Sequence, residues 1–383
     1  MGGWPSKATP ASSASGWSSL LPELSDLILR SLPSLADRVR FASVCRHWRH
    51  AVKHYSLQAA SLPRALPWLN FRSGRFRSLP DGELHSFRFR KYTLCFGCFD
   101  NWLLFEEAGC RPSRRYYLQN PLITGATKRL PGYCMEPVHL NPDGSHGTSS
   151  SSRSTEFYIS KVIMCSRDLV VAKLNYQHRP DAVVCCRPGM SSTWLTGLCN
   201  GNWYHDMAFY EGKLYTVTVE GDLFVNEVSS NGTGTEEPRV SRMEQVIQGT
   251  PNSATRCYLV ISCTSKLLLV RWIIPQDPTQ EMTMKVLEAD LKMSRWLEVE
   301  SLGDQVLFIS SYCSKAVTAS SHGGYLQRNQ IYFLDDGLVH WFLGPCGNRQ
   351  ACGVFHMSSN TIHPISLGEE HLSTQSKASW FFP

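Results

Sequence analysis

A long series of short apolar runs, separated by turn residues, occupies most of this chain from residue 72 onward. The clearest part is 207–228, where turns at Glu211-Gly212 and at 220–222 bound a run of strand length. Within that run, alternate residues differ in character, which gives it the two faces of a β-strand. The segment predicts an antiparallel meander of three strands, and similar runs lie before and after it.

The length of this region decides between the possible all-β folds. Residues 72–383 are far too many for one β-sandwich of ~100 residues. At ~40–45 residues for each four-stranded blade, the region holds six or seven blades, depending on how much chain its loops take. Polar stretches at 141–155 and 229–239 are such loops. We therefore predict a mainly β fold, with a six- or seven-bladed β-propeller over 72–383.

The segment 17–55 has helical periodicity instead. Pro22 suits the first position of a helix, and apolar residues then recur at helical spacing as far as Leu32. Ser34, with an acidic residue three positions later, predicts a capping box that begins a second helix, and another apolar stripe follows over 41–52. Three short helices enclose only a thin core. The surplus of Leu, Val and Trp therefore predicts a docking face for another protein.

The residues of this helical segment also resemble a known family. The pattern L-P-E-L…I-L…L-P…D…R…V-C-R-x-W-R between Leu21 and Arg49 is similar to the F-box, the adaptor-binding module of cullin-RING ubiquitin ligases. The resemblance implies that a Skp-type adaptor binds this face. The adaptor-binding residues that it implies are Leu21, Pro22, Leu24, Ile28, Leu32, Val44 and Trp48.

Two other interpretations of the helical segment stay open. It could be an ordinary helical cap packed on the rest of the chain. It could also be a basic helix-turn-helix that binds DNA, although a recognition helix should carry exposed polar residues that read bases, and 44–48 reads Val-Cys-Arg-His-Trp.

A second resemblance covers most of 68–336. Motifs recur there in the order found in a large plant family that joins an F-box to a KIB-type β-propeller. They include Asn120-Pro121, 161–166, 205–215, 258–260, 267–270, 302–304 and 329–336. The resemblance fades after Asp336, so it leaves the last blade and its closure unsupported. The expected domains are a disordered tail at 1–16, the F-box at 17–55, a linker at 56–71 and the propeller at 72–383.

Composition narrows the possible partners. No run reaches the ~18 apolar residues of a membrane span, and no secretory signal stands near Met1. We therefore expect a protein of the cytoplasm, the nucleus or both, with no membrane partner. The net charge of +6 is modest and the basic cluster at 72–91 is sparse, so we expect no nucleic-acid partner. The 14 cysteines are scattered, which in a reducing compartment predicts small buried hydrophobic residues.

Motifs for catalysis or metal binding are missing from the sequence. Cys95 and Cys98 form the only C-x-x-C pair, and a structural zinc site needs a second pair. We read them as buried thiols in a strand and turn. His205-Asp206 resembles half of a catalytic dyad, but no nucleophile is marked nearby, so we expect a turn and strand edge there. We therefore predict no catalytic residues, no cofactor-binding residues and no metal-binding residues, and hence no cofactor.

The expected function follows from the two resemblances. They imply the substrate-receptor subunit of an SCF-type ubiquitin ligase, with the F-box on the Skp-type adaptor and the propeller on an unknown target protein. The protein itself would not be an enzyme. The alternative is a propeller interaction scaffold that acts outside any ubiquitin ligase. An enzyme with its site in the central channel is disfavoured, because no inward cluster of acids, histidines or metal ligands is evident.

Overall fold

The structure is a computed structural model. It describes residues 20–57, 65–71, 74–79, 81–87, 89, 93–99, 101–107, 115–123, 125–135, 153–154, 157–176, 180–196, 202–229, 238–249, 254–273, 283–334, 352–365 and 378–383. The predicted tail at 1–16 lies outside these residues.

Three helices form the N-terminal part of the described chain: α1 (Pro22–Ser31), α2 (Leu35–Val44) and α3 (Arg46–Leu57). Pro22 stands at the start of α1, where its missing N–H costs no helical hydrogen bond. Ser34 precedes α2, but its side chain makes no capping hydrogen bond, and its hydroxyl is buried without a partner among the described residues. The predicted start of α2 is confirmed, whereas the predicted capping box is wrong. None of the described helices is long and apolar enough to cross a bilayer.

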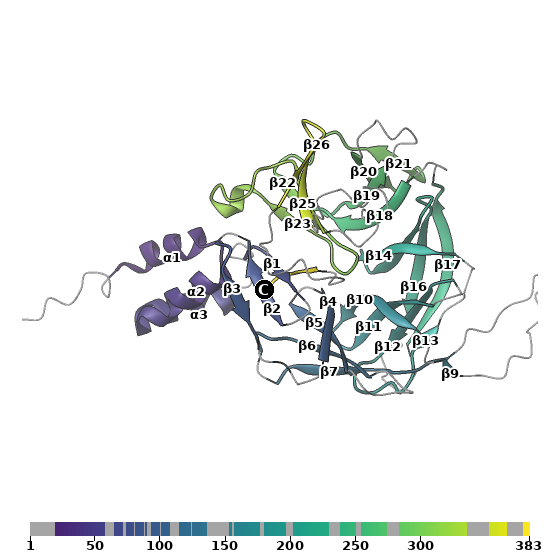
Figure 1. Cartoon of the computed structure of the whole chain (residues 1–383), viewed down its shortest axis with the longest axis horizontal. Helices are drawn as coiled ribbons and strands as arrows, with labels where there is room; N and C mark the ends of the chain where they lie inside the picture. The colour runs from purple at the N-terminus through teal and green to yellow at the C-terminus, as the bar shows by residue number, and fades with distance from the viewer. Residues whose placement is uncertain are drawn as a thin grey trace, which may run out of the picture.

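The described strands form six blades of a β-propeller (Figure 1). The first blade contains β27 (Ser379–Phe381), β1 (Trp68–Asn70), β2 (Arg75–Ser78) and β3 (Leu84–Ser86), and the second contains β4 (Thr93–Phe99), β5 (Trp102–Glu107), β6 (Arg115–Gln119) and β7 (Thr127–Leu130). The third contains β10 (Tyr158–Ser166), β11 (Leu169–Asn175), β12 (Ala182–Cys186) and β13 (Leu195–Thr196), and the fourth contains β14 (Tyr204–Tyr210), β15 (Lys213–Thr218), β16 (Leu223–Ser229) and β17 (Arg239–Ile247). The fifth contains β18 (Ala254–Ile261), β19 (Leu267–Ile273), β20 (Thr283–Asp290) and β21 (Arg295–Glu298), and the sixth contains β23 (Lys315–Thr318), β22 (Gln305–Ile309), β24 (Gln330–Leu334), β25 (Cys352–His356) and β26 (Thr361–Pro364). A small separate pair joins β8 (Cys134–Met135) to β9 (Arg153–Ser154). The prediction of a mainly β fold with six or seven blades and a small helical module is confirmed, with six blades.

The meander predicted over 207–228 is present as β14, β15 and β16. Glu211 and Gly212 both have positive φ, 48° and 77°, which is the geometry of a tight hairpin turn between twisted strands. Gly212 supplies the second of these conformations without steric cost.

The first blade closes the ring. Its inner strand β27 comes from the C-terminal end of the chain and pairs antiparallel with β1, with Trp380 opposite Leu69. Strand β1 begins at Trp68, so the propeller starts inside the segment 56–71 that was predicted to be a linker. The closing strand lies in the part of the chain where the family resemblance fades.

The sixth blade departs from a simple meander. Strand β23 turns back from β22 and occupies the inner edge of the blade. The chain then passes through the short helix η1 (Ser320–His322) and returns as β24, which runs parallel to β22. This return places 312–322 beside the centre of the propeller.

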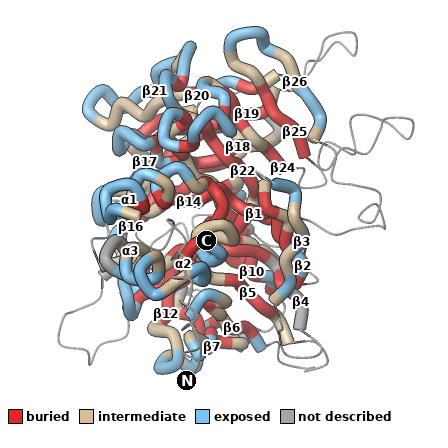
Figure 2. Tube along the Cα trace, turned by 90° about the vertical axis from the view of Figure 1, so that its left-hand side faces the viewer, coloured by how far each residue is buried: buried red, intermediate tan, exposed pale blue. Residues whose placement is uncertain are grey.

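Apolar side chains pack between neighbouring blades. Val171 and Cys185 of the third blade share a cluster with Met207 and Leu214 of the fourth. Figure 2 shows burial concentrated along the propeller strands, while the helices are mostly intermediate or exposed. Most of the described cysteines are buried free thiols, as predicted. Cys95 and Cys98 are buried together on β4, rather than divided between a strand and a turn.

Candidate adaptor-binding face and central channel

The helical module is fixed to the outer part of the first blade (Figure 1). The Leu66 N–H donates a hydrogen bond of 2.9 Å to the Pro33 carbonyl. Leu35 of α2 packs against the apolar cluster of the first two blades, and Arg40 pairs with Glu83 beside β3. The module is therefore attached through the Pro33–Leu35 junction and one side of α2.

Another side of the module presents apolar side chains to solvent. Leu21, Leu24 and Val44 are 62%, 45% and 59% exposed. Exposed apolar residues gathered on one small unit are typical of an interaction surface. This exposure argues against the interpretation of a helical cap sealed on the propeller.

The residues implied to bind the adaptor fall into two groups. Leu21, Pro22, Leu24 and Val44 are exposed, whereas Ile28, Leu32 and Trp48 are partly buried. Trp48 stacks on the buried Phe41, with ring centroids 4.3 Å apart, so it also holds α2 against α3. Leu27 and Val39 are exposed apolar residues of the same module that the resemblance did not imply. The binding role of all these residues stays a prediction.

Among the described residues, Asp81, Glu83 and His85 form the one group whose ligand atoms lie close enough to hold a metal ion. Each already has a structural partner. Asp81 accepts a hydrogen bond of 2.9 Å from the Glu83 N–H, Glu83 pairs with Arg40, and the His85 ring stacks on Trp68 at 4.5 Å. The Arg40–Glu83 pair belongs to the attachment of the helical module, and the other two contacts lie within the first blade.

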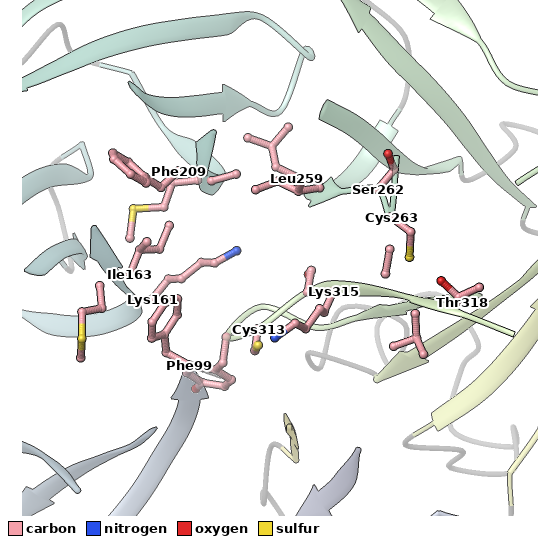
Figure 3. A pocket seen from close by; sticks show the side chains of 18 of the residues that line it. Phe99, Lys161, Ile163, Phe209, Leu259, Ser262, Cys263, Cys313, Lys315 and Thr318 are labelled. Carbon is pink, nitrogen blue, oxygen red and sulfur yellow. The ribbon is translucent and has the colours of Figure 1, made fainter. Parts of the chain in front are cut away.

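The centre of the propeller contains a cavity of about 660 Å³ (Figure 3). Its wall comes from the inner strands β4, β10, β14 and β18 and from residues 312–322. Most of the lining side chains are apolar, among them Phe99, Ile163 and Leu259. Lys161 and Lys315 are the lysines in its wall, and no Asp or Glu belongs to the described lining.

His205 and Asp206 lie beside this cavity, inside strand β14. The register shifts between Tyr204 and Asp206, so His205 is the extra residue of a β-bulge. The prediction of a turn at this position is therefore wrong. The bulge directs both residues toward the inner edge of β18, which pairs with no further strand in the part of the chain that the structure describes.

Asp206 joins three blades. One carboxylate oxygen accepts hydrogen bonds from Lys161 of β10 at 2.6 Å and from the Met207 N–H at 2.8 Å. The other oxygen accepts from the Leu259 N–H of β18, also at 2.8 Å. Both charged side chains are almost completely buried. The pair thus gives hydrogen-bond partners to polar groups that would otherwise be buried between blades without them.

His205 makes a second contact of this kind. Its Nδ1 accepts a hydrogen bond of 3.1 Å from the Cys257 N–H of β18, which requires an unprotonated nitrogen. Burial, together with the charges of Arg256, Lys173 and Arg271, lowers the pKa of His205 to about 3. The imidazole therefore has a structural role as a neutral acceptor, and the arrangement does not provide a nucleophile and base.

The stability of the fold should consequently depend on His205 in mild acid. Below pH 6.5 the unfolded chain binds a proton at this side chain, but the folded chain does not until the pH approaches 3. Stability is therefore lost as the pH falls through this window, by about 2 kcal/mol between pH 7 and pH 5 for this group. The measurement is denaturant unfolding of the wild type and of His205→Asn at both pH values.

The asparagine variant is a matched control, because its amide oxygen can accept the Cys257 hydrogen bond but cannot titrate. Its loss of stability between pH 7 and pH 5 should be smaller than that of the wild type by about 2 kcal/mol. An identical pH dependence of the two proteins would contradict the role assigned to His205.

Comparison with known proteins agrees with this architecture. Residues 76–356 match the family model described as the KIB1-4 beta-propeller. An Arabidopsis thaliana protein whose name assigns it an F-box is 25% identical, over 96% of this chain and 98% of its own length. Another F-box protein of Arabidopsis thaliana is 23% identical, over 86% of this chain and 92% of its own. The F-box protein KIB4 of Arabidopsis thaliana is 27% identical, over 46% of this chain and 42% of its own.

The matched region contains strands of all six blades, from β2 to β25, and relatives matched over more than nine-tenths of their length are named as F-box proteins. The predicted resemblance to plant F-box proteins with a KIB-type propeller is confirmed: the chain belongs to the KIB1-4 beta-propeller family.

Proposed function

We propose that this protein is the substrate-receptor subunit of an SCF-type cullin-RING ubiquitin ligase. The helical module binds a Skp-type adaptor, and the propeller holds a target protein. The observation that carries the proposal is the exposed apolar face of Leu21, Leu24 and Val44 on a module that is anchored elsewhere. Membership of an F-box-containing propeller family supports it.

In this role the protein performs no bond chemistry. It raises the effective concentration of a target lysine near the activated ubiquitin, which is catalysis by proximity. The attachment of the module to the first blade gives the adaptor and the propeller a defined relative orientation. We place this activity in the cytoplasm, the nucleus or both.

The test is a double substitution, Leu24→Asp with Val44→Asp. Each exposed leucine or valine contributes ~1.5–3 kcal/mol when it is buried in an interface, before the cost of association. Charged groups at both positions should weaken binding to the adaptor by at least about a hundredfold. Affinity for the purified adaptor, measured by calorimetry, gives the answer. Both side chains face solvent, so the melting temperature should stay unchanged.

Met293→Asp is the matched control, because Met293 is an apolar residue on the fifth blade that is 65% exposed. This variant should bind the adaptor like the wild type. Full adaptor binding by the double variant would contradict the proposed face. A wild-type chain that fails to bind an immobilised adaptor–cullin complex would instead favour an interaction scaffold outside the ligase.

A further inference from the structure

The central cavity has the size and character of a small-molecule site. Small-ligand pockets measure ~300–1,000 Å³ and are mainly apolar, with a few polar groups that orient the ligand. The cavity of about 660 Å³ lies within this range. Met207, Phe209 and Leu259 provide apolar surface from two adjacent blades.

The lysines of the described wall come from two different parts of the propeller. Lys161 and Lys315 lie on the wall, and Figure 3 shows the Lys161 side chain extending into the open space. Asp206 does not itself line the cavity, and its two oxygens are already occupied by three donors. The pair with Asp206 offsets the charge of Lys161, and Lys315 adds a second ammonium, which lies 5.1 Å from the centre of the Phe382 ring.

Lys161 has hydrogen-bonding capacity left over. Its side chain is only 7% exposed. An ammonium group carries three donors, and within the described part of the chain the Asp206 carboxylate is the acceptor found for one of them. Buried donors of a charged group need further acceptors. A ligand in the cavity can supply such an acceptor, and an anionic oxygen makes a stronger hydrogen bond to an ammonium than a neutral oxygen does.

We propose that the central cavity binds a small organic anion with an apolar body. The anionic group contacts the ammonium of Lys161, with Lys315 adding to the positive charge around it. The apolar body lies against Phe209, Leu259 and their neighbours on β14 and β18. This site is distinct from the adaptor-binding face and does not depend on the ligase function.

The test uses 1-anilinonaphthalene-8-sulfonate, an anion with an aromatic body that becomes fluorescent in apolar sites, on the full-length protein. One probe should bind per chain. Decanoate should displace it, whereas decyltrimethylammonium, which has the same chain length and the opposite charge, should not. Every titration is repeated on the Leu24→Asp/Val44→Asp chain, so that binding to the helical module is recognised and subtracted.

Two variants remove the lysine ammonium groups from the cavity wall. Lys315→Met removes one lysine, and Lys161→Met/Asp206→Asn removes the buried pair together, so that no uncompensated charge is left behind. Each should weaken sulfonate binding about tenfold. The neutral analogue N-phenyl-1-naphthylamine should bind both variants within about twofold of the wild type. Lys285→Met, an exposed lysine outside the cavity, should change neither affinity.

A third variant tests the location. Ser321 is an exposed residue that lines the cavity, so Ser321→Trp should obstruct the opening and abolish binding of both probes. The proposal is overturned if no saturable one-to-one binding is found, if the ammonium compound displaces the probe as well as decanoate, or if Lys315→Met and Ser321→Trp bind like the wild type.

Discussion

Replacing Asp206 with alanine should lower the free energy of unfolding by about 3–5 kcal/mol, because it breaks a buried ion pair and leaves one charge behind. The Lys161 side chain, which is only 7% exposed, would lose its carboxylate partner. The Leu259 N–H on the free edge of β18 would lose its acceptor at the same time. Denaturant unfolding of the purified protein at pH 7 measures the effect.

A second variant separates the ion pair from the backbone contact. Lys161→Met/Asp206→Asn removes both charges and keeps an amide oxygen for the Leu259 N–H. It should be more stable than Asp206→Ala, because no unpaired charge stays buried. The exposed pair of Lys285 and Glu298, at 3.0 Å, is the control. Glu298→Ala should cost less than about 1 kcal/mol.

A loss of less than about 1 kcal/mol for Asp206→Ala would show that the contact across the three blades contributes no more than a surface pair. Asp206→Ala should also loosen some blades more than others. The fourth blade and the inner edge of the fifth are both held by residues of the β14 bulge, so hydrogen exchange should rise there first.

The regular elements of this fold could be predicted from the sequence because residues close together in the chain determine them. The hairpin between β14 and β15 follows from a two-residue turn ending in Gly212 and from alternating strands on either side. Helix α1 follows from Pro22 and from apolar residues at helical spacing. Each of these elements is decided within about ten residues of sequence.

The closure of the ring and the sixth blade could not be read in this way. Strand β27 is three residues long, too short to show a periodicity, and its partner β1 lies near the other end of the chain. The parallel pairing of β22 with β24 depends on the path of the segment between them around the inner edge. The pairing of β27 with β1 and that of β22 with β24 both depend on which strand edges the other blades leave unpaired.

The cavity and its charged pair could be predicted only in part. Lys161 stands in the apolar strand β10, and a charged residue in such a run indicates a buried partner. The sequence does not show that the partner is Asp206, because a β-bulge in another blade brings it into reach. The exposed apolar face of the helices was easier to predict, since a unit of this size has more apolar surface than it can bury.

Closure of the ring through β27 should be essential for the stability of the propeller, and Trp380→Ala tests this. Trp380 is completely buried, it donates from Nε1 to the Ile309 carbonyl at 3.0 Å, and its ring meets Phe308 edge to face. The substitution would open a large cavity between the first and sixth blades and leave a carbonyl without its donor. We expect the free energy of unfolding to fall by about 3–5 kcal/mol.

Trp203→Ala is the matched control, because Trp203 is 52% exposed and lies outside the clusters of buried apolar residues. It should cost far less than Trp380→Ala, in keeping with a surface position. Denaturant unfolding and limited proteolysis measure the stability of the two variants. Trp380→Ala should also expose the C-terminal segment to protease, because β27 is held to β1 by only three residue pairs and depends on the packing of its side chains. Equal stability of the two variants would mean that the first blade holds together through β1, β2 and β3 alone, with β27 an accessory strand.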